Sequence, residues 1–197
     1  MINVRTPDGF YESSHTYPEY LNQLKTVWKD TQIVQAALIP KTYSDTFRRY
    51  MVLTTLKRLT KEKISQKPFN GLRDNIREQQ FTLMNEWRDK ADQALIDGSY
   101  RLSSRYGIEF KVLMNETTPL GVFFDNKNVI SYSSIMSGEK SVNGINENFI
   151  QVIATSIVLL KKKIIFVYIY SDYDSEKDIT WIEGKTKELI SLLIKNN

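Results

Sequence analysis

Residues 149–170 read FIQVIATSIVLLKKKIIFVYIY, two apolar runs on either side of three lysines. The runs at 149–159 and 164–170 are rich in β-branched and aromatic residues, a composition typical of strands. The lysines between them favour a solvated hairpin turn over a phosphate-binding role. Because both runs are nearly continuous in apolar residues, each face of the sheet that they form must be covered by another layer.

Segments with helical periodicity can provide these layers. Residues 68–98 place Leu72, Ile76, Leu83, Trp87, Ala91 and Ala94 on one face. Pro68 suits the first turn of this long helix, and Gly98 suits its end. A C-terminal helix, capped by Asp174 or Ser175, has an apolar stripe formed by Ile179, Ile182, Thr186, Leu189 and Leu193. A shorter helix is expected around Pro18.

The remaining segments predict further strands. Strand-like runs occupy residues 33–39, 49–56, 108–114, 120–124 and 129–135, and residues 125–128 have the composition of a turn. Residues 136–147, with Gly138 and Gly144, are the best candidate for a mobile loop. The sequence therefore predicts a single α+β domain over residues 1–197, in which helices cover both faces of an antiparallel sheet (an α/β/α sandwich) and one long helix is central.

The composition describes a soluble, folded protein. Hydrophobic residues make up 41% of the 197 residues, charged residues 25%, and cysteine is absent, which excludes disulfides and thiolate metal sites. The 27 basic residues face 23 acidic ones along the chain, so we expect no nucleic-acid partner. No apolar run is long enough to span a membrane. Met1 is either the native start, which favours the cytoplasm, or a replacement for a removed leader, which favours export to the periplasm.

Motifs of known catalytic chemistry are absent from the sequence. His15 is the only histidine, so mechanisms that need a histidine pair are excluded, and a solvated or capping role is expected for it. The chain has no Walker sequence, no GxGxxG and no His-Glu-x-x-His motif. We therefore predict no cofactor and no catalytic residue.

One acidic segment, residues 172–183, has the spacing of a calcium loop. Its candidate ligands are Asp172, Asp174, Glu176, Asp178 and Glu183. Lys177 stands at the sixth position, where a calcium loop of this kind needs glycine, and a strand rather than a helix precedes the segment. The alternative interpretation, which we favour, is that these acids lie near the positive end of the last helix dipole.

Three tyrosines alternate along the last strand and its exit. Tyr168, Tyr170 and Tyr173 are typical of cross-strand packing, and a partner-binding patch is the functional alternative. The other carboxylates are scattered along the chain. Whether any of them converge into a site depends on the fold.

Several segments together resemble a known family. They are residues 7–10 (PDGF), 48–52 (RRYMV), 119–123 (PLGVF), and the strand at 164–170 that leads into residues 178–181 (DITW). Their order resembles small bacterial proteins with the Mog1/PsbP-like fold, in which helices pack on both sides of an antiparallel sheet. The resemblance implies a protein that is often exported and that acts as a binding or accessory protein rather than an enzyme.

Three functional hypotheses remain at this point. The favoured one is a non-enzymatic protein-binding or accessory module whose partner is another protein. The second is a hydrolase or small-ligand-binding protein whose carboxylates converge only in the fold. The third is a toxin-neutralising immunity protein, suggested by the small size of the chain and its lack of active-site motifs.

Overall fold

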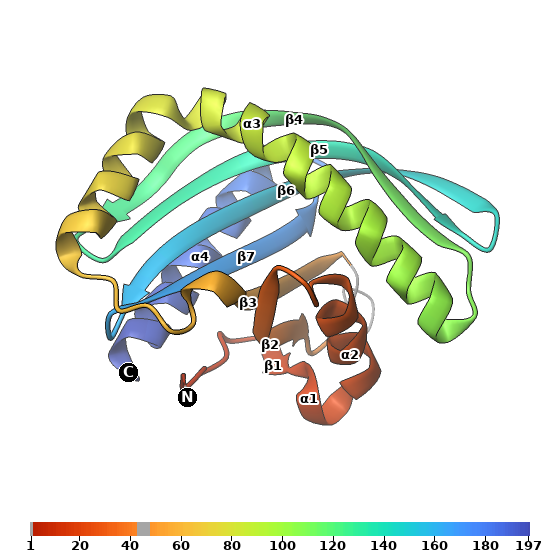
Figure 1. The fold of residues 1–197 in the computed structure, drawn as a ribbon, viewed down its shortest axis with the longest axis horizontal. Coiled ribbons are helices and arrows are strands. Elements are labelled where there is room, and N and C mark those ends of the chain that lie inside the picture. The colour runs from red at the N-terminus through yellow and green to blue at the C-terminus, as the bar shows by residue number, and fades with distance from the viewer. Residues whose placement is uncertain (1, 43–47) are drawn as a thin grey trace.

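The computed structural model describes residues 2–42 and 48–197, except for the side chains of residues 80, 81 and 83–91. In those residues seven strands form one antiparallel sheet in the order β1-β2-β3-β7-β6-β5-β4 (Figure 1). The strands are β1 (Phe10–Glu12), β2 (Gln32–Pro40), β3 (Arg49–Leu56), β4 (Phe110–Asn126), β5 (Val129–Val142), β6 (Ile145–Leu160) and β7 (Lys163–Asp172). The apolar runs that decide the fold thus form β6 and the central strand β7.

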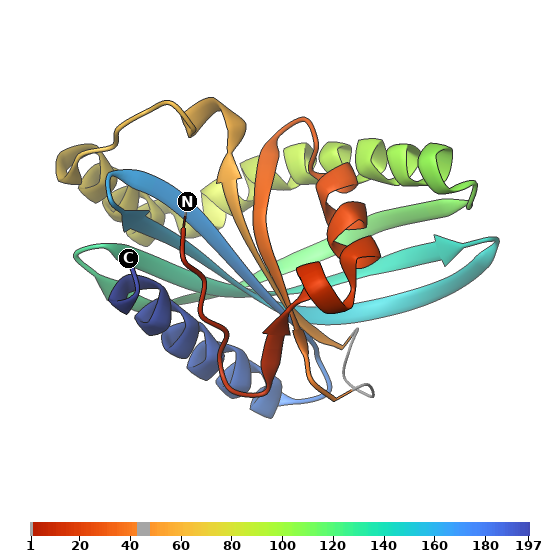
Figure 2. The same cartoon turned by 90° about the horizontal axis from the view of Figure 1, so that it is seen from below.

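Helices cover both faces of this sheet. They are α1 (Ser13–Thr16), α2 (Pro18–Val27), α3 (Gln66–Tyr106) and α4 (Glu176–Lys195). Figure 2 shows α4 on one face and both α2 and α3 on the other. The predicted fold class, an α+β sandwich with helices on both faces and one long helix, is confirmed. No helix in the described part of the chain combines the length and apolar composition needed to cross a bilayer.

The central strand connects the two apolar layers. Val167 and Ile169 are buried in the cluster that contains the inward stripe of α4. The alternate residues, Ile164 and Phe166, belong to a second cluster with Phe69 of α3. This alternation follows from the two-residue period of a strand. Because burying a large apolar side chain contributes roughly 1.5–3 kcal/mol, both faces of β7 hold the layers together.

The long helix extends beyond its predicted end. α3 continues to Tyr106 and ends at Gly107, whose φ of 66° is the left-handed conformation common at helix ends. The prediction of Gly98 as the stop is wrong: this residue is buried inside the helix, beside Val27 of α2. Ile76 and Leu72 face the core as predicted. The side chains of Leu83, Trp87 and Ala91 lie outside the described residues.

Two predicted strands form one, and a third element was missed. Residues 108–114 and 120–124 belong to the single strand β4, whose pairing with β5 shifts register three times. One shift lies between Pro119 and Gly121, so the proline is accommodated at an irregular point of an edge strand. The short strand β1 has too few residues for a period to be read from the sequence.

The loop predicted at residues 136–147 is instead the end of a long hairpin. β5 and β6 pair continuously up to Val142 and Ile145. Asn143 and Gly144 form the turn, both with positive φ. Gly138 lies within β5, where a Cβ would overlap the Leu113 carbonyl oxygen of β4. Its small size thus permits close contact between strands rather than mobility.

The turn predicted between β6 and β7 is confirmed. Lys161 and Lys162 have φ of 48° and 64°, which matches a tight two-residue hairpin turn. The next residue, Lys163, donates from Nζ to the carbonyl oxygens of Thr60 at 2.6 Å and Glu62 at 2.7 Å. It therefore fixes the connection that leads from β3 into α3.

An ion-pair cluster attaches the first half of α3 to the end of β4. Arg73 donates to Asp125 from Nε at 2.9 Å and from Nη2 at 2.6 Å, and Arg77 also contacts this carboxylate. Burial alone would raise the pKa of Asp125, but hydrogen bonds and charge from the two arginines lower it below its ordinary value. The carboxylate is therefore ionised at neutral pH and orients this end of the helix.

Candidate functional site

An open groove lies between the C-terminal end of α2 and the C-terminal part of α3. Its volume is about 460 Å³. The residues that line it are Asn22, Lys25, Thr26, Lys29, Tyr100, Arg101, Ser104 and Arg105. Four of them are cationic and none is a carboxylate. The groove is therefore a basic surface on a chain whose charges are otherwise nearly balanced.

Arg101 of α3 lines the groove and contacts the end of α2. Its Nε donates to the carbonyl oxygen of Thr26 at 3.1 Å, and its Nη2 donates to that of Val27 at 2.6 Å. Its Nη1 contacts Asp30 at 2.8 Å. Carbonyl groups in the last turn of a helix lack partners within the helix. The guanidinium thus satisfies the end of α2 and connects the two helices.

The other three cations are arranged around this anchor. Arg105 donates from Nη1 to the Thr26 hydroxyl at 3.0 Å, and its guanidinium lies 5.5 Å from the ring centroid of Tyr106. Lys25 and Lys29 are exposed on the α2 side. Within the described part of the chain neither lysine ammonium is paired with a carboxylate. Their charge faces solvent at the mouth of the groove.

Exposed apolar side chains lie beside this positive charge. Tyr100 is 77% exposed and lines the groove, and Ile96, which is 45% exposed, lies four residues earlier on α3. Residues four apart on a helix are neighbours on its surface. The two side chains therefore form a small apolar strip on the surface of α3, and Tyr100 brings this strip to the edge of the groove.

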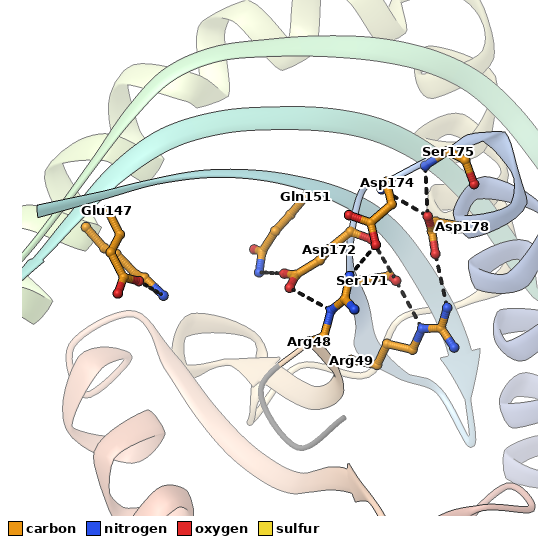
Figure 3. A network of polar contacts seen from close by, with 10 residues as sticks. Arg48, Arg49, Glu147, Gln151, Ser171, Asp172, Asp174, Ser175 and Asp178 are labelled. Atoms are coloured by element: carbon orange, nitrogen blue, oxygen red, sulfur yellow. Dashed lines mark hydrogen bonds and ion pairs between the residues drawn. The ribbon is translucent and has the colours of Figure 1, made fainter. Parts of the chain in front are cut away.

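A second polar site joins β3, β7 and the start of α4 (Figure 3). It encloses about 90 Å³ and is lined by Arg48, Arg49, Ser171, Asp172, Asp174 and Asp178. Asp178 is the most buried of its carboxylates. It accepts hydrogen bonds, each 3.0 Å long, from the backbone N–H groups of Asp174 and Ser175 and from Nη2 of Arg49.

These contacts keep Asp178 ionised. Burial would raise its pKa, but the N–H groups and the Arg49 guanidinium outweigh burial and lower the pKa below its ordinary value. Arg49 also lies 4.3 Å from the ring centroid of Trp181. This cation–π contact and the ion pair together fix the first turns of α4 against the sheet.

The five predicted calcium ligands are not gathered into one cage. Asp172 and Asp174 contact Arg48, and Asp178 contacts Arg49. Glu176 is exposed at the start of α4, and Glu183 lies about two turns further along that helix. Among the described residues no group of three or more acidic or histidine side chains is placed to hold a metal ion. Calcium binding by this segment stays a prediction, which calorimetry with millimolar calcium can test.

The three tyrosines of the predicted patch do not share one face. Tyr168 stacks on Trp28 at 6.5 Å between ring centroids, and Tyr170 stacks on Tyr50 at 4.4 Å, both on the α2 side. Tyr173 packs against the cluster on the α4 side. Burial raises the pKa of the Tyr168 hydroxyl to about 12, although hydrogen bonds with Gln32 and Thr54 lower it in part. A role for the three tyrosines in partner binding stays a prediction.

The basic groove was not predicted from the sequence. Arg101 and Arg105 are four residues apart, which places them on one side of α3. Lys25 and Lys29 have the same spacing, with Lys25 in the last turn of α2 and Lys29 in the turn that follows this helix. This spacing is the one feature of the sequence that points to the basic groove. The two pairs lie far apart in the sequence, and only the packing of α2 on α3 brings them together. His15 is exposed in α1, outside both sites.

Comparison with known proteins gives structural neighbours only. No protein-family model matches the chain, and no curated protein matches it in sequence. Among solved structures, it is similar to the Ran-binding protein Mog1p of Saccharomyces cerevisiae, with 10% identity, a TM-score of 0.41, and coverage of 100% of this chain and 95% of that one. A Mog1 mutant gives 11% identity, a TM-score of 0.41, and coverage of 99% and 88%. Both structures carry the name Mog1, which is also part of the name of the fold that the sequence resembles.

Proposed function

We propose that this chain is a protein-binding module that receives its partner in the groove between α2 and α3. The observation that carries the proposal is the combination of four cationic side chains with the exposed ring of Tyr100 along one open cavity. Tyrosine and arginine are enriched at the energetic centres of protein interfaces. A side chain as large as Tyr100 loses much exposed surface when a partner covers it.

The rigidity of the groove supports the same proposal. Arg101 connects α3 to the end of α2 through three contacts, and Gly98 allows the two helices to lie close together at Val27. A binding surface that is formed before the partner arrives requires little ordering on association, which favours affinity. The groove is therefore a preformed surface on which a partner can dock with little loss of conformational entropy.

The carboxylates that come together near the start of α4 do not favour the hydrolase alternative. Asp172, Asp174 and Asp178 do come together, as the alternative hypothesis requires, but each contacts an arginine. A general acid needs a raised pKa, and the pKa of Asp178 is lowered. This arrangement is that of an ion-pair network which holds α4 in place.

Site-specific photocrosslinking tests the proposal. A photoreactive phenylalanine analogue is introduced at Tyr100 and, in a control protein, at Lys61, an exposed residue between β3 and α3 that does not line the groove. Each protein is expressed in cells of its source organism, which are then irradiated. We expect the protein with the photoreactive residue at position 100 to form an adduct of discrete mass with a second protein, and the protein with that residue at position 61 to form none. Introducing Lys25→Glu and Lys29→Glu should abolish that adduct.

Two results would overturn the proposal. One is the absence of any protein adduct at position 100 from cells in which the variant is folded and expressed at its normal level. The other is an equal set of adducts from positions 100 and 61, because that pattern indicates contact by collision rather than by a site.

A further inference from the structure

We infer that the segment bound in the groove between α2 and α3 is acidic, and that Lys25 and Lys29 recognise its carboxylates while an apolar side chain of the same segment covers Ile96 and Tyr100. This inference rests on the proposed function and names the chemistry of its partner. It follows from which cations of the groove already have hydrogen-bond or ion-pair partners within the protein and which do not.

The four cations divide into two kinds. The guanidinium of Arg101 is engaged by Thr26, Val27 and Asp30, and that of Arg105 donates to the Thr26 hydroxyl, so both arginines are positioning residues for the groove. The ammonium groups of Lys25 and Lys29 have no carboxylate partner in the described part of the chain. Two unpaired positive charges without a lining carboxylate attract negative charge, and the site therefore selects an acidic ligand.

The apolar strip specifies the second property of the partner. Tyr100 lines the groove and Ile96 is exposed one helical turn before it on α3, so a segment that contacts the lysines and continues along α3 covers both apolar side chains. A segment with carboxylates on one side and apolar residues on the other matches this arrangement. An amphipathic acidic helix is the simplest chain element with that pattern.

An acidic protein segment fits the groove better than a nucleic acid. Nucleic-acid sites contact many phosphates in a row through basic stripes, and single strands also need several stacking rings. The groove has two unpaired lysines and one exposed ring, and the chain as a whole has 27 basic and 23 acidic residues. Such a surface suits a short acidic segment.

The inference is tested with defined peptides. The first probe is a synthetic amphipathic helix of glutamate and leucine, and the matched probe has glutamine in place of every glutamate. We expect the glutamate peptide to bind at least about tenfold more tightly than the glutamine peptide, with the difference reduced at high salt. Fluorescence anisotropy measures both affinities.

Charge-reversal variants locate the binding. Lys25→Glu with Lys29→Glu should weaken binding of the glutamate peptide at least about tenfold, because two attractions become repulsions. Lys61→Glu with Lys63→Glu introduces the same charge change at exposed positions away from the groove and should change affinity less than about twofold. A peptide with lysine in place of glutamate should bind the Lys25→Glu, Lys29→Glu protein better than the unmodified one.

The outcomes separate the inference from the proposed function. The inference of an acidic partner would be overturned if the glutamate and glutamine peptides bound with equal affinity. It would also be overturned if the two double variants lost equal affinity for the glutamate peptide. Tighter binding of a single-stranded oligonucleotide or of anionic lipid vesicles, lost in the Lys25→Glu, Lys29→Glu protein, would also overturn it. If the photocrosslink at position 100 succeeds while the peptides fail, protein binding stands and its acidic specificity falls.

Discussion

Gly98 of α3 lies directly against Val27 of α2: a Cβ atom at position 98 would come within 2.7 Å of Val27 Cγ1 and 3.3 Å of the Val27 Cα and carbonyl oxygen. This contact sets how closely the two helices approach, and the basic groove lies beside it. The glycine that would be a helix stop in a sequence-based prediction is thus a packing residue.

Substitution of Gly98 should therefore depart from the usual effect of alanine in helices. Replacing glycine by alanine inside a helix normally stabilises by about 1 kcal/mol. Gly184 of α4, around which a Cβ would meet no atom within 4 Å, should show that gain when replaced by alanine. Gly98→Ala should show no gain, and Gly98→Val should destabilise by about 2 kcal/mol or more.

Urea midpoints of the three variants measure this difference. If Gly98→Ala is stabilised as much as Gly184→Ala, the helices are not in close contact at this point. The groove would then lack the fixed geometry on which its proposed role depends.

Arg101→Lys should destabilise the protein by about 1–2 kcal/mol, because lysine cannot replace a fork that donates to two carbonyl groups at once. Lys25→Glu with Lys29→Glu, at exposed positions, should change the free energy of unfolding by less than about 0.5 kcal/mol. Chemical denaturation of both variants tests whether Arg101 positions the helices while Lys25 and Lys29 serve binding alone. Comparable losses of stability in the two would contradict that division.

Asp178→Asn should destabilise the protein at pH 7 by about 1–3 kcal/mol, since Arg49 loses its partner in a half-buried contact. Asp174→Asn, at a more exposed ion pair, should cost no more than about 0.5 kcal/mol. Unfolding free energies from urea titrations at neutral pH measure both changes.

The contribution of Asp178 to the free energy of unfolding should decrease as the pH falls. Its pKa is lowered in the folded state, so its stabilisation is present above the ordinary aspartate pKa of about 4 and is lost as the pH falls through the lower folded value. The gap between wild type and Asp178→Asn should therefore narrow below about pH 4. A gap that stays constant down to about pH 2 would show that the carboxylate is not held ionised by these contacts.

The hairpin turn between β6 and β7 can be improved. Lys161 and Lys162 both have positive φ, which asparagine and glycine adopt at lower cost than lysine. Lys161→Asn with Lys162→Gly should raise the free energy of unfolding by about 0.5–1 kcal/mol. Valine at both positions should lower it, and thermal or urea unfolding distinguishes the two results.

Local features of the chain were predictable because their causes are local. The turn at residues 160–163 and the inward stripe of α4 follow from side-chain periodicity and turn chemistry within a few residues. Capping chemistry limited the start of α4 to Asp174 or Ser175, and the structure has Ser175 as the cap. The need for a layer on each face of β7 followed from its continuous apolar composition. The hairpin at 136–147 was mistaken for a loop because Gly138 was interpreted without the strand that it touches.

By itself, the sequence determined the sheet, the covering helices and the absence of cysteine chemistry, since these depend on composition and on periods of two or 3.6 residues. The tertiary structure alone decided the groove: Arg101 contacts Thr26 across 75 positions of sequence. It also decided that Asp172 and Asp174 meet Arg48 and that Asp178 meets Arg49. Such pairings depend on how helices and strands pack, and no period within one segment carries that information.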